Sequence, residues 1–180
     1  MFKIDIFDFQ MFSALTIGGP FGIPDTELFL FDSTGHGVYA NDDMGGSDPN
    51  AITLSCLPSV INNPCAEPSQ PGVGPTSNGV YYLAITRSAN LPLDASFNDI
   101  FLPFINIGDV VGPDLGGGGV NPVAGFDGGA FSSPDFDQIN YDILLTGTTA
   151  TTPEPATWSL ISLAGLGLLL LRRKTARRQH

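Results

Sequence analysis

The last thirty residues constrain this chain most, because an uncharged apolar run there is followed by a strongly basic end. The run extends from Ala156 to Leu171, sixteen residues without a charge. As a helix it would be roughly 24 Å long, a little short of the ~30 Å hydrocarbon core of a bilayer. Trp158 at one interface and snorkelling arginine side chains at the other would cover the difference. We therefore expect residues 156–171 to form a transmembrane helix, with a buried C-terminal helix as the alternative.

The basic residues after this run predict its orientation. Arg172, Arg173 and Lys174 follow it directly, and two more arginines stand within residues 172–180. Because basic segments remain on the cytoplasmic side of a membrane, residues 172–180 are expected to form a cytoplasmic tail. Residues 1–155 would then lie outside the membrane.

A short motif stands immediately before the apolar run, Pro153, Glu154 and Pro155. A Pro-Glu-Pro motif, one short hydrophobic helix and an arginine-rich end together resemble the PEP-CTERM sorting signal of bacteria. The resemblance implies that an exosortase recognises this motif, processes the chain at or near it, and removes the helix and basic end. It also implies an inner-membrane precursor that becomes a cell-surface or extracellular protein, often in bacteria that make exopolysaccharide.

Charge divides the chain into an acidic body and a basic tail. Residues 1–150 contain seventeen acidic residues but only two basic ones, Lys3 and Arg87, a net charge of −15. Such a body repels phosphate backbones, which argues against nucleic acid as a partner. It attracts cations, including calcium.

The body is predicted to be all-β. The 22 glycines, 15 prolines and 13 phenylalanines favour many turns between aromatic-rich strands. The expected class is an antiparallel, jelly-roll-like β-sandwich, followed by the single C-terminal transmembrane helix. The sandwich would occupy residues 1–147, and a Thr/Pro linker residues 148–155. Periodicity and composition predict strands at residues 3–9, 11–17, 27–31, 38–40, 51–57, 80–86, 100–107 and 139–146.

Three stretches of the body occur in a characteristic order. They are Asp-Thr-Glu-Leu-Phe-Leu-Phe-Asp at 25–32, Asn-Asp-Asp at 41–43 and Gly-Val-Tyr-Tyr-Leu-Ala-Ile at 79–85. This series resembles the bacterial pre-peptidase C-terminal (PPC) domain group. The resemblance covers about residues 5–147 and implies a small β-sandwich of the kind attached to secreted peptidases or surface proteins.

The first residues lack the basic and apolar regions of a secretory signal peptide. Residues 1–9 instead alternate in the manner of a strand. We therefore expect the chain to begin inside the mature domain, with Met1 as an internal residue of a longer precursor.

Two cysteines, Cys56 and Cys65, lie in one loop-like stretch with eight residues between them. In an exported protein this spacing suits a local disulfide. Two free thiols are the alternative. Two cysteines and two distant histidines do not make a zinc site.

The most promising binding site in the sequence is a calcium site. Acidic residues cluster around a polar loop and the ends of neighbouring strands, and hard cations bind six to eight oxygen ligands. Glu27 belongs to the same neighbourhood. The alternative is that Asp42 and Asp43 cap turns by accepting backbone hydrogen bonds. The candidate ligands are Asp25, Asp32, Asn41, Asp42, Asp43 and Asp48.

Catalytic motifs are scarce. The chain has no Gly-x-Ser-x-Gly motif, and its two histidines are His36, in an expected turn, and His180. The leading hypothesis is a non-catalytic surface or extracellular-matrix protein, with extracellular polysaccharide as a candidate partner. A calcium-dependent glycan- or protein-binding module is the second hypothesis and a hydrolase the third. The aromatic side chains considered for a binding platform, with core packing as their alternative role, are Tyr39, Tyr81 and Phe126.

Overall fold

Antiparallel strands provide most of the regular structure in the computed structural model, which describes residues 1–18, 25–45, 53–65, 73–128 and 141–150. The expected antiparallel all-β class is thereby confirmed for the body. One short 3-10 helix, η1 (Gly118–Val120), is also present among these residues. The strands are β1 (Phe2–Ile6), β2 (Ser13–Gly18), β3 (Thr26–Asp32), β4 (Gly37–Asn41), β5 (Cys56–Leu57), β6 (Gly79–Arg87), β7 (Pro92–Leu93), β8 (Val110–Val111), β9 (Gly125–Phe126), β10 (Tyr141–Thr146) and β11 (Thr148–Ala150).

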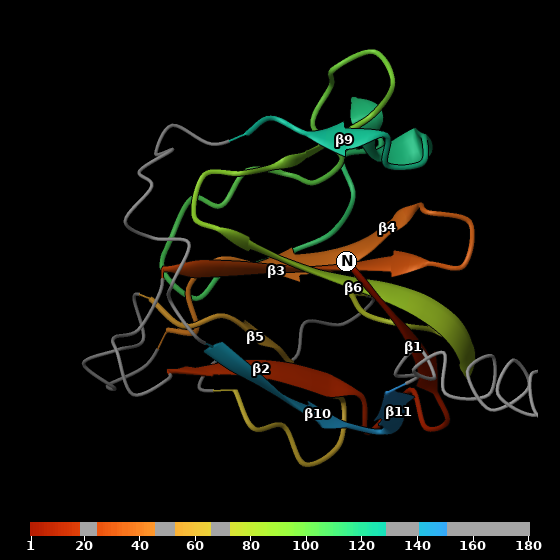
Figure 1. The fold of residues 1–180 in the computed structure, drawn as a ribbon, viewed down its shortest axis with the longest axis vertical. Helices are drawn as coiled ribbons and strands as arrows, with labels where there is room; N and C mark the ends of the chain where they lie inside the picture. Colours follow the sequence, from red (N-terminus) through yellow and green to blue (C-terminus); the bar gives the residue numbers. More distant parts are fainter. Residues whose placement is uncertain (19–24, 46–52, 66–72, 129–140, 151–180) are drawn as a thin grey trace, which may run out of the picture. The chain divides into compact units, whose positions relative to one another are not determined.

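The largest sheet in the described part of the chain has six strands, in the order β11-β1-β6-β3-β4-β8, and all its pairings are antiparallel (Figure 1). Strand β3 lies between β6 and β4. Leu28 and Leu30 face one hydrophobic cluster, and Phe29 and Phe31 face another, as strand alternation predicts. All four side chains are fully buried. Both faces of β3 are therefore covered, which explains why its sequence is an unbroken apolar run.

A second sheet, β10-β2-β5, supplies side chains to the cluster on the Leu28 face. Ile6 of β1, Ala14 of β2 and Leu57 of β5 are buried together there. Burying a side chain of the size of isoleucine or leucine stabilises the fold by roughly 1.5–3 kcal/mol. The two sheets therefore form the layers of a sandwich with a shared core.

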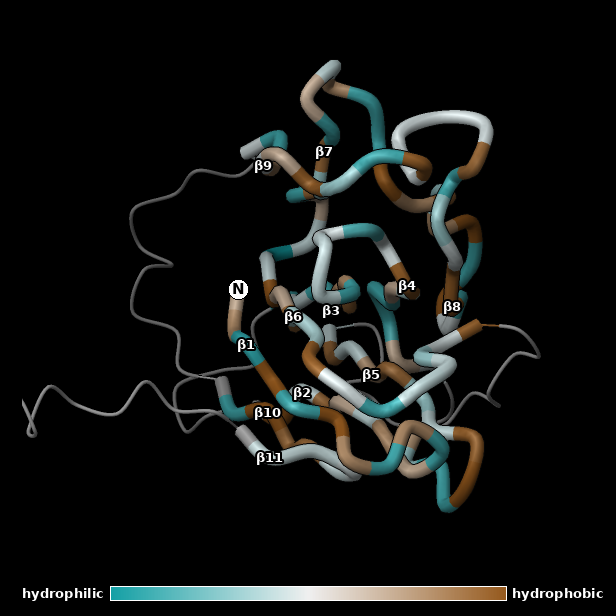
Figure 2. Tube along the Cα trace, turned by 90° about the vertical axis from the view of Figure 1, so that its right-hand side faces the viewer, coloured by the Kyte–Doolittle hydropathy of each residue, from teal (hydrophilic) through white to brown (hydrophobic). Residues whose placement is uncertain are grey.

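The opposite face of the large sheet is covered by aromatic side chains from residues 91–126. The ring of Phe29 lies 5.5 Å from that of Phe101, 6.5 Å from that of Phe104 and 6.4 Å from that of Phe126, between centroids. The short pair β7-β9 belongs to this layer. Figures 1 and 2 show it on one side of β3, β4 and β6, with β2, β5 and β10 on the other.

The strand expected at residues 100–107 is absent from the structure. Ile100 and Phe101 are buried as a strand would bury them, but the backbone here forms the isolated bridge Phe101–Pro113 and a few separate hydrogen bonds, without a regular ladder. Pro103 has no N–H to donate to a ladder, so regular pairing cannot continue through it. The strand expected at 51–57 is likewise limited to Cys56–Leu57 among the described residues.

The body extends further than expected, because Thr148–Ala150 form β11 and pair with β1 instead of starting a linker. Gly147 makes the corner between β10 of the small sheet and β11 of the large one. Its φ is +65°, and a Cβ there would lie 2.6 Å from the carbonyl oxygen of Asp8. Its own carbonyl accepts hydrogen bonds from the N–H groups of Phe7 and Asp8. Only glycine can adopt this positive φ and fit beside Asp8 without strain, because it has no Cβ.

Cys56 and Cys65 are joined in a disulfide, as their spacing predicts, with Cα atoms 5.6 Å apart. The alternative of two free thiols is therefore wrong. The bond ties the loop after β5 back to the buried strand. In the chain-entropy description, a loop of this length contributes about 3 kcal/mol to stability.

Candidate functional site

Three carboxylates meet at one end of the β3–β4 hairpin. Asp25 directly precedes β3, and Asp42 and Asp43 directly follow β4. Because the two strands are antiparallel, with Leu28 opposite Asn41, the start of one lies beside the end of the other. One carboxylate oxygen from each aspartate lies within 4.8 Å of the others.

Asp42 is the most perturbed of these groups. Its Oδ1 is buried and has no hydrogen-bond partner among the described residues. Burial, followed by the negative charges of Glu27, Asp43 and Asp25, raises the pKa of Asp42 to about 7 from an ordinary value of 3.8. The site thus concentrates negative charge with little compensation.

The neighbouring acids show the same trend. Burial raises the pKa of Asp43, with the charge of Asp25 adding to it. Burial also raises the pKa of Asp25, against the opposing charge of Arg87. A cation within reach of these oxygens would relieve the repulsion, and carboxylate oxygens are the ligands that calcium prefers. The donor set therefore fits a hard cation, provided that carbonyl groups and water complete the coordination.

Asn41 has a structural role beside this cluster. Its Oδ1 accepts the N–H of Cys56, and its Nδ2 donates to the carbonyl oxygens of Asp43 and Asp109. The side chain is 1% exposed, and its oxygen already has a partner. Asn41 therefore holds the Asp42–Asp43 segment in place against β5.

Asp32 lies at the other end of β3, away from the cluster. It accepts hydrogen bonds from the N–H and hydroxyl of Thr34 and from the N–H of His36. Although burial tends to raise the pKa of Asp32, these hydrogen bonds lower it overall. Here the aspartate closes a turn, the role considered for Asp42 and Asp43. Asp48, another proposed ligand, lies outside the described residues.

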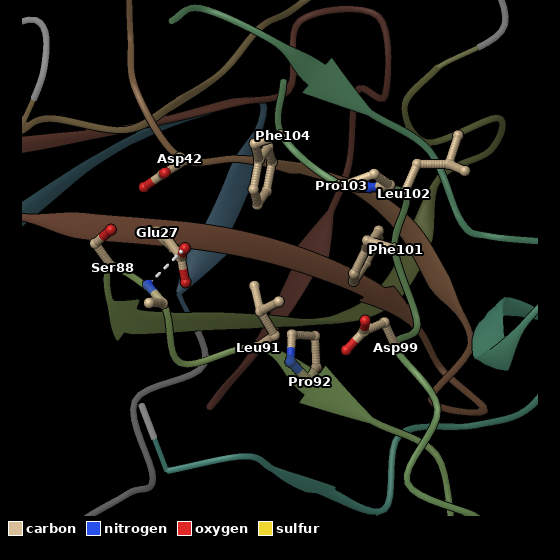
Figure 3. Close-up of a pocket in the computed structure, with 11 residues that line it drawn as sticks. Glu27, Asp42, Ser88, Leu91, Pro92, Asp99, Phe101, Leu102, Pro103 and Phe104 are labelled. Carbon is tan, nitrogen blue, oxygen red and sulfur yellow. Dashed lines mark hydrogen bonds between the residues drawn. The ribbon is translucent and has the colours of Figure 1, made fainter. Parts of the chain in front are cut away.

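A pocket of about 250 Å³ adjoins the acidic cluster through Asp42. Figure 3 shows Glu27 and Asp42 on one side of it, with the rings of Phe104 and Phe101 nearby. Glu27 is 2% exposed; its Oε1 accepts the N–H of Ala89 at 2.9 Å and its Oε2 the hydroxyl of Thr86 at 3.2 Å. Burial raises the pKa of Glu27 in spite of these hydrogen bonds.

The pocket wall was not predicted from the sequence. Phe101 and Phe104 come from the segment that was expected to be a strand, and their approach to Phe29 depends on an irregular backbone. The aromatic residues around Pro103 were the only sequence pattern that pointed to this wall. They indicated buried side chains but not a cavity.

The proposed aromatic platform is not supported for its two tyrosines. Tyr39 is fully buried and Tyr81 is 7% exposed. Their hydroxyls donate to the carbonyl oxygens of Pro58 and Ser77. Phe126 is partly buried and packs against the core cluster around Phe29. Core packing, the alternative role, is confirmed for both tyrosines.

A second loop presents an exposed ring. Phe97 is 82% exposed with a φ of +64°. Asp94 organises the loop by accepting hydrogen bonds from the N–H groups of Ser96 and Asn98 and from the amide of Asn121. The hydrogen bonds, led by that of Asn98, lower the pKa of Asp94 to about 2. No pattern in the sequence predicted this loop.

Comparison with known proteins identifies the tail. Residues 151–174 match the family described as the PEP-CTERM protein-sorting motif. No curated protein and no solved structure matches the chain. The resemblance of the body to the pre-peptidase C-terminal group is not supported by a family match.

The matched segment contains the predicted motif, Pro153, Glu154 and Pro155, and ends at Lys174. It indicates an exported bacterial protein directed to the cell surface, with exosortase as the enzyme that recognises its signal. The sorting motif itself, the expected transmembrane helix at 156–171 and the basic residues Arg172, Arg173 and Lys174 all lie outside the described residues. Within the described part, no helix has the length and apolar character needed to cross a membrane.

Proposed function

We propose that this chain is the precursor of a non-catalytic surface or extracellular-matrix protein. Its body would be a jelly-roll-like sandwich, and residues 156–171 would hold it in the inner membrane until an exosortase acts near Pro153–Pro155. The observation that carries the proposal is the sorting-motif match at residues 151–174, directly after β11. Once released, the acidic body would join the cell surface or an extracellular polysaccharide matrix.

The surroundings of His36 support a role without catalysis. Its Nδ1 shares a hydrogen bond of 2.7 Å with the hydroxyl of Thr34, which also contacts Asp32 at 2.7 Å. These groups close the turn of the β3–β4 hairpin. A histidine that serves as a general base for a hydroxyl needs a substrate position beside it, whereas this hydroxyl is already held within the turn.

The mass of the mature protein tests the sorting proposal. The full chain, expressed in a host with an exosortase and in the same host without it, should lose its C-terminal segment only in the first. Glu154→Ala should prevent the loss, whereas Asp142→Asn, which removes one charge from an exposed position of β10, should not. The same full-length mass in both hosts would refute the proposal.

A second candidate function, a calcium-dependent binding module, is favoured by the cluster of Asp25, Asp42 and Asp43. Three carboxylate oxygens within 4.8 Å, one of them on a side chain with a buried unpartnered oxygen, are a donor set suited to a divalent cation. Bound calcium would offset the mutual repulsion of the carboxylates and present a positive centre to hydroxyl or carboxylate groups of a glycan or protein.

Calorimetric titration of the chelator-treated full chain in detergent tests the calcium proposal. We expect a dissociation constant of about 0.1–1 mM, the range of extracellular calcium modules. Asp43→Asn should weaken binding by at least about tenfold, because a charged ligand is lost. Asp142→Asn should leave it unchanged. No binding heat and no change in melting temperature at millimolar calcium would refute the proposal.

A further inference from the structure

The pocket beside Asp42 combines acidic and apolar surface. Its lining includes the carboxylates of Glu27, Asp42 and Asp99, and none of the described residues that line it is basic. The rest of the lining is largely apolar and includes Leu91, Phe101 and Phe104. A ligand that fits this surface needs a cationic group and an apolar part.

The acidic side of the pocket has capacity for a hydrogen-bond donor. The carboxylate of Glu27 accepts hydrogen bonds from the N–H of Ala89, the hydroxyl of Thr86 and the N–H of Asn90, and a carboxylate can accept about four. The buried Oδ1 of Asp42 has no partner among the described residues. A buried oxygen without a donor is costly, so a cation that donates hydrogen bonds here would gain both charge pairing and hydrogen bonding.

The apolar side is held by the core. Phe101 and Phe104 pack against Phe29, which is fully buried in β3. Phe101 also packs edge-on against Phe31, with ring centroids 5.6 Å apart. These contacts fix the aromatic wall before any ligand arrives, which lowers the entropy cost of binding.

We propose that this pocket binds a primary ammonium group on an aliphatic stem. The ammonium would lie between Glu27 and Asp42, and the stem would lie along Leu91, Phe101 and Phe104 (Figure 3). A hydrated metal ion alone would leave this apolar wall without a partner. The volume of about 250 Å³ is below the usual range of small-molecule sites, about 300–1,000 Å³, so it suits a group of side-chain size. A lysine side chain of a partner protein and a free alkylamine both have this chemistry.

Titration of the full chain in detergent, with chelator present, tests the pocket. The probes are n-butylammonium, the neutral isostere n-butanol and Nα-acetyl-lysine amide. We expect n-butylammonium to bind at least about tenfold more tightly than n-butanol, since only the former pairs with a carboxylate. Tighter binding of the lysine amide than of n-butylammonium would identify a partner's lysine as the ligand, and the reverse order a free amine.

Variants separate the pocket from general charge attraction and from the calcium cluster. Asp42→Asn should weaken n-butylammonium binding by at least about tenfold, and Phe104→Ala by about threefold or more. Asp142→Asn is the control of equal charge and should have no effect. Phe104→Ala should leave calcium binding unchanged, so the two proposals can fail separately.

The proposal is overturned if n-butanol binds as well as n-butylammonium, or if Asp142→Asn weakens binding as much as Asp42→Asn. It is also overturned if neither amine binds. Circular dichroism of each variant checks that the fold is retained. If Asp42→Asn does not fold, the wild type and Phe104→Leu still test the pocket. The proposal is refuted if each of these two proteins binds n-butylammonium no more tightly than n-butanol.

Discussion

The two ends of the β3–β4 hairpin place aspartates in opposite environments. At the turn end, Asp32 accepts hydrogen bonds from Thr34 and His36, and its pKa is lowered. At the open end, Asp42 has a buried oxygen without a partner and a pKa raised to about 7. The same residue type therefore has two different roles. Hydrogen-bond donors surround the carboxylate of Asp32, whereas other carboxylates surround that of Asp42. The turn end stabilises the fold, and the open end is the candidate cation site.

Calcium should produce the largest difference between the two ends. At a concentration 100 times its dissociation constant, calcium would stabilise the full chain by about 2.7 kcal/mol, because it binds only the folded state. Differential scanning calorimetry with and without calcium measures this effect. Asp42→Asn should abolish the gain and Asp32→Asn should retain it. If both variants lost the stabilisation by calcium equally, the two ends of the hairpin would not differ in calcium binding.

The contributions of Asp42 and Asp32 to the stability of the fold should change in opposite directions as pH rises. The folded-state pKa of Asp42 lies near 7, above its ordinary 3.8, so between these values the folded state holds a proton that the unfolded chain has released. Its contribution to stability therefore falls as pH rises through this window.

In chelator, Asp42→Asn should raise the melting temperature at pH 8 by about 3 °C or more, and by clearly less at pH 5, which lies early in the window between 3.8 and about 7. Thermal melts at both pH values measure this difference. Asp32 has a lowered pKa, so its stabilisation should instead be lost as pH falls below about 4. An increase at pH 5 as large as that at pH 8 would contradict the raised pKa of Asp42.

At the turn end, Asp32→Ala should reduce the free energy of unfolding by about 1 kcal/mol at pH 7, since three donors lose their acceptor and turn to water. Urea denaturation measures the change. Asp142→Ala is the matched control on an exposed strand position. A stabilised Asp32→Ala protein would show that the turn end, too, is under electrostatic strain.

The smallest effect is expected for Thr34→Val. It removes the hydroxyl that donates to Asp32 but keeps the backbone N–H donor, so we expect a loss of about 0.5 kcal/mol. Urea denaturation of Thr34→Val and Asp32→Ala, measured side by side, shows how much of the stabilisation by Asp32 comes from the Thr34 hydroxyl. A loss greater than that of Asp32→Ala would mean that the contact of Thr34 with His36 dominates the turn.

Local patterns in the sequence were reliable where the interaction itself is local. The sorting motif at 151–174 is read along the chain without reference to a fold. The disulfide joins nearby residues of one segment. Alternation in β3 predicts which of its side chains share a face, because neighbouring side chains of a strand point in opposite directions.

Local patterns did not predict how segments far apart in the sequence pair. Residues 100–107 have apolar side chains typical of a strand, but Pro103 prevents regular pairing. Thr148–Ala150 look like a polar linker, yet β1 offers them a free edge beyond the Gly147 corner. In both cases the partner strand, and not the segment's own composition, decided the structure.

The sequence by itself determined that this chain carries a sorting signal on an acidic, β-rich body with two nearby cysteines, and the structure joined those cysteines in a disulfide. Tertiary structure alone decided which acids meet. Antiparallel pairing of β3 with β4 places Asp25 beside Asp42 and Asp43. It also leaves Asp32 at the far end of a strand whose seven residues span about 24 Å. Before folding, these aspartates were equivalent candidates, because only the register between strands assigns each one its neighbours.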